Sequence, residues 1–162
     1  MTKVKIKLNG GIMPKKATDG SAAYDLYVPE DVIFTRGNRK VLDLKFSMEI
    51  PKGYAATIQP RSGFSAKGME VVTYDTYPFD DPVTEEGRID ADVVRGLIDA
   101  DYRGSVGVII KINEQHDEIL FRKGTRIAQM QIIEVPQIEL EEVDELSKTD
   151  RGEGGFGSTG TK

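Results

Sequence analysis

Hydrophobic residues recur at every second position over several short segments of this chain, which is the period of a β-strand. Residues 4–8 alternate Val, Ile and Leu with Lys, and residues 42–50 alternate apolar side chains with Asp, Lys, Ser and Glu. Neighbouring side chains of a strand point to opposite faces, so we expect both segments to be half-buried strands. Two runs rich in β-branched residues, 106–112 and 127–135, favour strands at the centre of a sheet.

Turn signals separate these segments. Glycine stands beside Asn, Arg, Pro or Lys near positions 10, 37, 53 and 124. Many short strands joined by such turns are typical of an all-β barrel or sandwich. A helical period is scarce. Leu140, Val143 and Leu146 are spaced by three within a Glu-rich stretch, which could be a helix or a polar connector.

One long segment, from Met69 to Arg95, departs from the alternating pattern. It mixes Tyr74, Tyr77 and Phe79 with prolines and eight acidic residues. Such a mixture does not make a clean strand, so we predict a long surface excursion at residues 69–95. Exposed aromatic side chains favour an interaction surface, and a tolerated loop insertion is the alternative.

Composition narrows the classes of function. The 162 residues suffice for one domain with a genuine core. A net charge of −5 and the lack of a Lys/Arg-dense stretch argue against direct DNA binding. The chain has no Cys and one His, His116, which we expect to face solvent, so zinc chemistry and His-based triads are nearly excluded. No membrane-spanning run or signal-peptide pattern occurs, and we expect a soluble, cytoplasmic protein.

The stretch 151–160 carries five glycines around one Phe, one Ser and one Thr. Glycine loses much entropy on ordering and buries no side chain, so this stretch is not expected to build a core. Its backbone N–H groups, Arg151, Ser158 and Thr159 suit phosphate oxygens, and Phe156 could stack on a base. We interpret it as a flexible arm that orders over a nucleotide; a plain Gly-rich terminus is the alternative.

Two loops carry groups suited to reacting phosphates. In residues 96–104, Asp99 and Asp101 would share one face of an extended segment, where a carboxylate could deprotonate a water; a hairpin turn with solvated acids is the alternative. In residues 60–68, Arg61 and Ser62 lie beside two glycines, as suits phosphate oxygens.

Two further segments place polar residues among apolar ones. Asp25 lies within the small and apolar residues 22–26, where it could serve a metal or hold a neighbouring Arg. Arg126 and Gln129 begin a strand that is otherwise apolar after residue 127. Each segment alone is a weak signal.

These five segments, in this order, resemble the five motifs of the trimeric deoxyuridine triphosphatases (dUTPases). The motifs correspond to residues 22–26, 60–68, 96–104, 124–129 and 151–160, and the third and fifth are highly specific. The stretch between the second and third motifs is about twice the family's usual length. Such insertions are a feature of staphylococcal phage members, in which the enzyme can also bind a repressor protein.

The resemblance implies an all-β, distorted jelly-roll barrel over residues 1–140, with an insertion at 69–95. It implies a flexible arm over residues 141–162, exchanged between the subunits of a threefold homotrimer. The implied reaction is water attack on the α-phosphorus of dUTP, giving dUMP and pyrophosphate, with Mg²⁺ on the three phosphates. This reaction keeps uracil out of DNA and supplies dUMP. A dCTP deaminase-like trimer and a non-catalytic nucleotide-binding regulator are the alternatives.

The resemblance also implies residue roles. Asp99 would be the general base, and Tyr102 would pack against the deoxyribose and leave no room for a 2′-hydroxyl. Asp25 and Gln129 would contact the waters of Mg²⁺. The remaining substrate-binding residues would be Arg61, Ser62, Gly63, Arg151, Phe156, Gly157, Ser158 and Thr159, with Gln129 shared. The implied partners are dUTP, the other two subunits and a repressor bound through residues 69–95.

Overall fold

A computed structural model describes residues 2–35, 39–76 and 83–154 of the protein. Its elements follow the order β1 (Lys5–Leu8), β2 (Tyr24–Tyr27), β3 (Val32–Thr35), β4 (Arg39–Asp43), β5 (Phe46–Glu49), β6 (Tyr54–Gln59), α1 (Ser62–Lys67), β7 (Met69–Asp75), β8 (Val83–Ile89), β9 (Ala91–Val94), β10 (Gly96–Ile98), β11 (Gly107–Ile112), β12 (Glu118–Phe121) and β13 (Arg126–Glu134). The prediction of an all-β fold is therefore confirmed.

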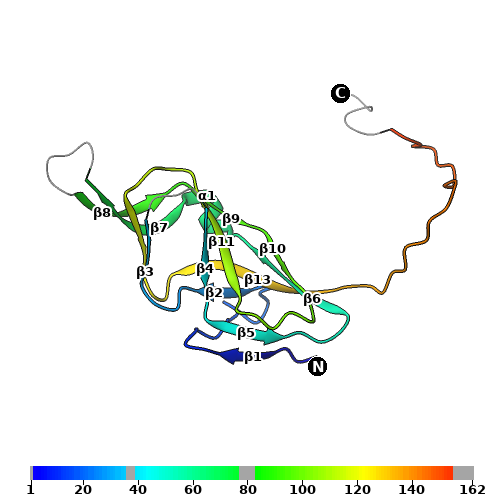
Figure 1. Ribbon diagram of the computed structural model, residues 1–162, viewed down its shortest axis with the longest axis horizontal. Coiled ribbons are helices and arrows are strands. Elements are labelled where there is room, and N and C mark those ends of the chain that lie inside the picture. Colours follow the sequence, from blue (N-terminus) through cyan, green and yellow to red (C-terminus); the bar gives the residue numbers. More distant parts are fainter. Residues whose placement is uncertain (1, 36–38, 77–82, 155–162) are drawn as a thin grey trace.

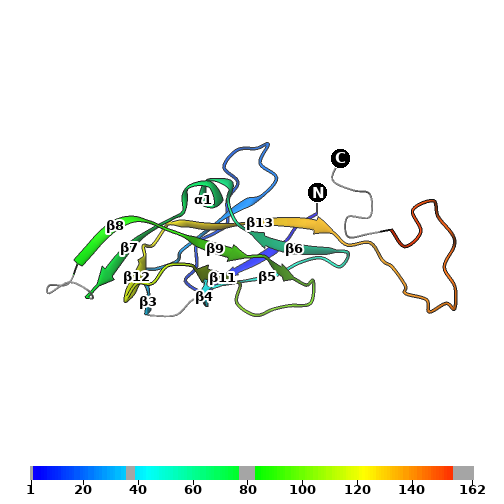
Figure 2. The ribbon, with the colours of Figure 1, turned by 90° about the horizontal axis from the view of Figure 1, so that it is seen from above.

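The strands of the described residues form four antiparallel sheets around one hydrophobic core (Figures 1 and 2). The sheets have the orders β10-β6-β13-β2, β4-β11-β9, β3-β12-β7-β8 and β1-β5. The two runs predicted to be central strands become β11 and β13, and each has a neighbour on both sides. These sheets do not join into one closed barrel within the described residues.

The alternating segment 42–50 is two strands and not one. Its even-numbered side chains are all buried, from Leu42 to Ile50, as the alternation predicted. However, Lys45 has a φ of 54°, in the left-handed region, and the chain turns there from β4 into β5. The strands enter different sheets, β4 beside β11 and β5 beside β1. The hydrophobic pattern is continuous across the corner because Leu44 stays in the core.

The segment 69–95 is not a surface excursion over its whole length. Its first part, β7, is an inner strand between β12 and β8, and its last part includes β9, which pairs with β11. Met69 and Val71 are buried, as are Ile89 and Val93. The end of β7 and the start of β8 project from the body, at the left of Figures 1 and 2. The prediction of a surface excursion was therefore wrong for both ends of the segment.

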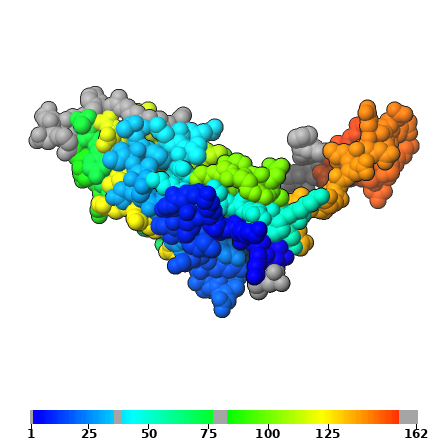
Figure 3. All heavy atoms as spheres, turned by 60° about the horizontal axis from the view of Figure 1, so that its bottom comes forward, coloured from blue at the N-terminus to red at the C-terminus, as the bar shows by residue number. Residues whose placement is uncertain are grey.

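The chain leaves the sheets after β13. The backbone N–H of Val135 donates to Gly53 O at 2.8 Å, and residues 136–149 form neither helix nor strand. This segment stands away from the body as the orange chain of Figure 3, and Leu140 is 93% exposed. The structure agrees with the polar-connector alternative. In the described part of the chain, no helix has the length and apolar character needed to cross a membrane.

Candidate functional site

Strand β13 brings three of the five predicted motifs together. Gln129 lies opposite Asp25 of β2 on one side and opposite Gln59 of β6 on the other. These polar residues border a pocket of about 310 Å³ at this end of the sheet. The pocket is lined by Ala17, Ser21, Ala22, Ala23, Asp25, Gln59, Arg61, Ser62 and Gln129. Gln59 was not predicted from the sequence as a pocket residue, because its position opposite Gln129 depends on strand register.

The carboxylate of Asp25 holds two arginines. Arg61 Nε donates to Asp25 Oδ1 at 2.8 Å, and Arg126 Nη1 lies 3.6 Å from Asp25 Oδ2. Asp25 is only 7% exposed, and a buried carboxylate is costly unless it is paired. The sequence left two roles open for Asp25, contact with a metal or pairing with a neighbouring Arg. The structure shows the pairing with Arg.

The first turn of α1 places Ser62 and Gly63 beside Arg61. Phe64 is buried and anchors the helix to the core, while Ser62 and Gly63 are exposed. The helix ends at Gly68, whose φ is 80° and where a Cβ atom would lie 2.7 Å from Ile89 O. Only glycine fits at this point, because a side chain would meet the backbone of β8.

Gln129 fixes the turn that carries Arg61. Its Nε2 donates to Pro60 O at 3.0 Å. Across the described residues, no group of three or more His, Asp or Glu side chains could hold a metal ion. The pocket thus offers one carboxylate already paired with arginines and the amides of Gln59 and Gln129. These groups suit contacts to the waters of a phosphate-bound cation better than direct coordination.

Asp99 lies on an exposed turn between β10 and β11. Tyr102 N donates to Asp99 O at 3.2 Å, and Arg103 Nη1 donates to Ala100 O at 2.6 Å and to Tyr102 O at 2.9 Å. Tyr102 is 46% exposed, and its Oη donates to Ser105 O at 3.0 Å. Asp99 therefore has an accessible carboxylate on a turn that is closed by its own hydrogen bonds.

The turn and the pocket lie at opposite ends of β6. Strand β10 runs antiparallel to β6, with Ile98 opposite Ala56 and Gly96 opposite Ile58. After Ile98 the chain continues toward the Tyr54 end of β6, and this is where Asp99 lies. Arg61 lies just beyond Gln59, at the opposite end of β6. At about 3.3 Å per residue, the five or six residues between these levels span on the order of 15–20 Å. One chain alone does not bring Asp99 to Arg61.

The C-terminal motif contributes one described residue. Arg151 is exposed, and its Nε donates to Gly154 O at 2.8 Å within the same segment. It is not brought to the pocket of its own chain. The predicted binding residues Phe156, Gly157, Ser158 and Thr159 lie outside the described residues.

His116 is not the solvent-facing residue that the sequence suggested. Its side chain is 18% exposed, its Nδ1 lies 2.8 Å from Asp75 Oδ2, and its Nε2 lies 3.2 Å from Glu114 Oε2. Burial lowers the pKa of His116, but hydrogen bonds and charges from Asp75 and Glu114 outweigh it and raise the pKa above its ordinary value of 6.5. The network ties the β11–β12 loop to the end of β7.

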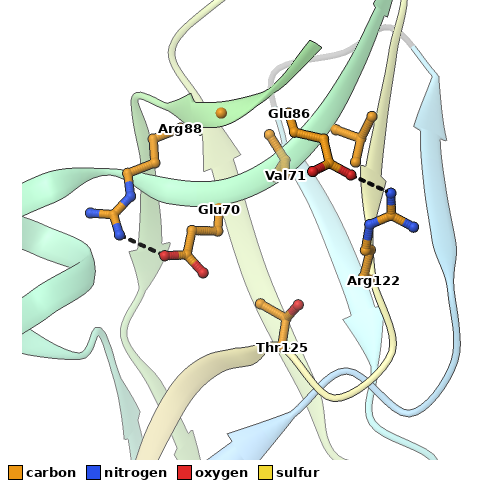
Figure 4. A pocket seen from close by; sticks show the side chains of 8 residues that line it. Glu70, Val71, Glu86, Arg88, Arg122 and Thr125 are labelled. Carbon is orange, nitrogen blue, oxygen red and sulfur yellow. Dashed lines mark hydrogen bonds and ion pairs between the residues drawn. The ribbon is translucent and has the colours of Figure 1, made fainter. Parts of the chain in front are cut away.

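A second pocket, of about 390 Å³, lies between the β7–β8 hairpin and the β12–β13 turn (Figure 4). Glu70 pairs with Arg88 at 2.5 Å and Glu86 pairs with Arg122 at 2.6 Å, so its four charges are matched. None of the predicted site residues lines it.

Comparison with known proteins converges on one family. The dUTPase family model matches residues 9–78 and 87–160. A deoxyuridine 5′-triphosphate nucleotidohydrolase of Nautilia profundicola is 40% identical over 161 residues, covering 98% of this chain and 99% of the relative. One from Hydrogenobaculum is 40% identical over 151 residues, covering 93% of this chain and 91% of the relative. The Staphylococcus bacteriophage 80alpha dUTPase with dUpNHpp has a similar structure, with a TM-score of 0.76, 25% identity and 99% of each chain covered.

Proposed function

The chain belongs to the dUTPase family, and from this premise we propose that it hydrolyses dUTP to dUMP and pyrophosphate by attack of water on the α-phosphorus. The observation that carries the mechanism is the pocket at Asp25, Arg61 and Gln129, which unites three predicted motifs and is suited to phosphate groups. The reaction removes a source of uracil in DNA and supplies dUMP. We propose that the enzyme acts in the cytoplasm.

Asp99 is the general base of the proposed reaction. Its carboxylate is exposed and makes no side-chain hydrogen bond or ion pair to another described residue, so it can accept a proton from water. The water oxygen bonds to the α-phosphorus while the bond from that phosphorus to the pyrophosphate oxygen breaks. The proton lost by the water is then on Asp99, and dUMP and pyrophosphate are the products.

The pocket binds the phosphates. Arg61 is oriented through Nε by Asp25, and within the described residues its terminal nitrogen atoms make no hydrogen bond, which leaves them for phosphate oxygens. Ser62 and the backbone of Gly63 lie beside it on the open first turn of α1. Fixed donors of this kind neutralise developing charge without reorganising during the reaction.

Tyr102 selects the sugar. Its ring is half exposed on the same turn as Asp99, so a deoxyribose can pack against it near the reacting carboxylate. A ring in that position leaves no room for a 2′-hydroxyl. Backbone groups of the turn would read the uracil edge, because a mismatched edge leaves buried polar groups unpaired.

The complete site requires more than one subunit. Asp99 and Arg61 follow opposite ends of β6, so a neighbouring subunit must supply one of them to the same dUTP. We propose a threefold homotrimer in which each site takes the Asp99 turn from one chain and the pocket from another. The arm of a third chain adds Arg151, Phe156, Gly157, Ser158 and Thr159. The connector projects from the body, which supports exchange of this arm.

Mg²⁺ is the proposed cofactor. It would neutralise charge on the triphosphate, with the phosphates as its main ligands. Asp25 and Gln129 would contact its waters, because Asp25 is already held by arginines and no carboxylate cluster surrounds it in the described residues.

Release of pyrophosphate from dUTP, dCTP, dTTP and UTP tests the activity. We expect rapid release from dUTP and at least about 10⁴-fold lower kcat/KM for UTP and dCTP. Comparable rates on UTP would contradict the role of Tyr102, and release of ammonia from dCTP would favour the deaminase alternative.

A second role as a repressor-binding protein is supported by the β7–β8 hairpin. The family model leaves out residues 79–86, of which residues 83–86 are the first four of β8. The similar phage 80alpha dUTPase controls transfer of virulence genes by a proto-oncogenic G protein-like mechanism. We propose that residues 69–95 contact a repressor, with Tyr74, Tyr77 and Phe79 as candidate anchors. Tyr77 and Phe79 lie outside the described residues.

The test is to replace residues 79–86 with a short Gly/Ser linker, which spares the core residues of β7 and β9. Calorimetry should show loss of repressor binding, while dUTP turnover and the melting temperature stay close to those of the wild type. Unchanged repressor affinity would eliminate this role.

A further inference from the structure

The Asp99 turn joins two different sheets, so its position depends on how its far end is held. It leaves β10, which pairs with β6, and enters β11, which pairs with β4 and β9. At the far end, Val106 N donates to Phe46 O at 2.8 Å, and Leu44 N donates to Val106 O at 2.9 Å. The end of the turn is therefore attached to the corner between β4 and β5.

Asp43, the last residue of β4, connects that corner to the turn. Its Oδ1 accepts a hydrogen bond from Lys45 N at 2.8 Å and one from Ser105 Oγ. The first bond supports Lys45 in its left-handed conformation. The second is the one side-chain hydrogen bond that links turn residues 99–105 to the rest of the described structure.

Ser105 passes this attachment on to Tyr102. The carbonyl oxygen of Ser105 accepts the hydrogen bond from Tyr102 Oη. The ring lies across Gly104 so closely that a Cβ atom there would be 2.3 Å from Tyr102 Oη. Tyr102 is thus held on its own turn by Gly104 and Ser105, and its backbone N–H is bonded to Asp99 O.

We propose that Asp43 is a positioning residue for dUTP hydrolysis, which fixes the Asp99 turn and the Tyr102 ring through Ser105. The inference rests on the proposed roles of Asp99 and Tyr102. Asp43 itself does not touch substrate. Its carboxylate fixes the position of the general base, Asp99, and holds the Tyr102 ring in the space of a 2′-hydroxyl. A reacting group displaced by about 1 Å can lower the rate on the order of 10²-fold.

The experiment compares steady-state kinetics of the full-length wild type, Asp43→Ala, Asp43→Asn and Ser105→Ala on dUTP and UTP. Asp43→Ala and Ser105→Ala should each lower kcat for dUTP about tenfold with KM changed less. Each should also reduce the preference for dUTP over UTP about tenfold. Asp43→Asn keeps an oxygen acceptor and should restore most of both quantities. A double variant that combines Asp43→Ala with Ser105→Ala should lose little more kcat and dUTP preference than either single variant, because the two residues form one link.

Glu30→Ala is the matched control. Glu30 pairs with the Lys45 side chain at 2.5 Å and makes no hydrogen bond to the turn, so its loss disturbs the same corner without releasing Ser105. Wild-type kcat and dUTP preference in Ser105→Ala would overturn the proposal even if Asp43→Ala failed to fold. An inactive wild type or an active Asp99→Asn would instead refute the proposed function, so the two failures are distinguishable.

Discussion

The two halves of the proposed site are built in opposite ways. The pocket at Asp25, Arg61 and Gln129 lies where the end of β6 meets β2, β13 and the start of α1, and the Asp25 carboxylate is nearly buried beside two arginines. The Asp99 turn is exposed, and most of its hydrogen bonds run within the turn. In the proposed reaction, phosphate binding thus depends on a partly buried pocket beside the sheet, and proton transfer depends on an exposed turn with a single side-chain attachment. Mutations in the pocket should affect stability and binding, and mutations in the turn should affect turnover.

The largest expected effect is that of Asp99→Asn. The amide keeps the shape of the side chain but does not accept the proton, so kcat should fall by about 10² to 10⁴ while nucleotide still binds. Pyrophosphate release and calorimetry with a non-hydrolysable dUTP analogue measure the two quantities. Asp101→Asn is the control, since Asp101 is exposed on the same turn and should keep near-normal activity. A kcat above a tenth of wild type would show that Asp99 is not the base.

Deletion of residues 151–162 should lower turnover by about tenfold or more and leave the fold intact. Arg151 bonds only within its own segment among the described residues, so the ligand-free melting temperature should scarcely change. Turnover falls because, without the arm, the site lacks Arg151, Ser158 and Thr159 as hydrogen-bond donors to the phosphates of bound dUTP. Differential scanning calorimetry and pyrophosphate release check both statements, and a large loss of ligand-free stability would mean that the arm is structural.

Asp25→Ala should destabilise the pocket half and raise KM. Removing the carboxylate leaves Arg61 and Arg126 without their partner, which we expect to cost about 2–3 kcal/mol, somewhat below the range for fully buried pairs because Arg61 remains partly exposed. Arg126→Ala should cost less, because Arg126 is more exposed and lies 3.6 Å from Asp25. Urea unfolding measures both, and equal effects of the two substitutions would argue against Asp25–Arg61 as the main pair.

The smallest expected effect concerns His116, which lies in neither half. Its folded-state pKa is raised above the ordinary value, so its contribution to stability is fully present below about pH 6.5 and is lost as pH rises through the folded pKa. His116→Gln should therefore lower the melting temperature by a few degrees, roughly the effect of 1 kcal/mol, at pH 6 and by less at pH 8.5. Asp75 and Glu114 are the charged groups that face His116. A larger deficit at pH 8.5 would reverse the assigned sign.

Parts of the fold were predictable because side-chain direction is a local property. The alternation in residues 42–50 identified five buried side chains, although it did not reveal the corner at Lys45. Strand β7 was misread because Val71 and Val72 are both buried, which hides the period of two, and because acids and aromatics follow in the hairpin. A strand with packing on both faces does not alternate.

The candidate chemistry of each motif could also be predicted, because residue type limits what each motif can do. Asp25 had two possible roles from sequence, and the choice of an arginine partner depended on Arg61 arriving from the end of β6. The links from Asp43 to Ser105 and from His116 to Asp75 join residues 62 and 41 positions apart, and neither lies in one recognisable motif.

By itself, the sequence determined the all-β class, the five motifs and the residue types available for phosphate binding and proton transfer. The tertiary structure decided which motifs meet in one chain. Periodicity records which way a side chain points from its own backbone, whereas distance between motifs depends on strand pairing and register. The antiparallel register of β10 on β6 alone sends Asp99 away from Arg61, and no local pattern in either strand records that separation.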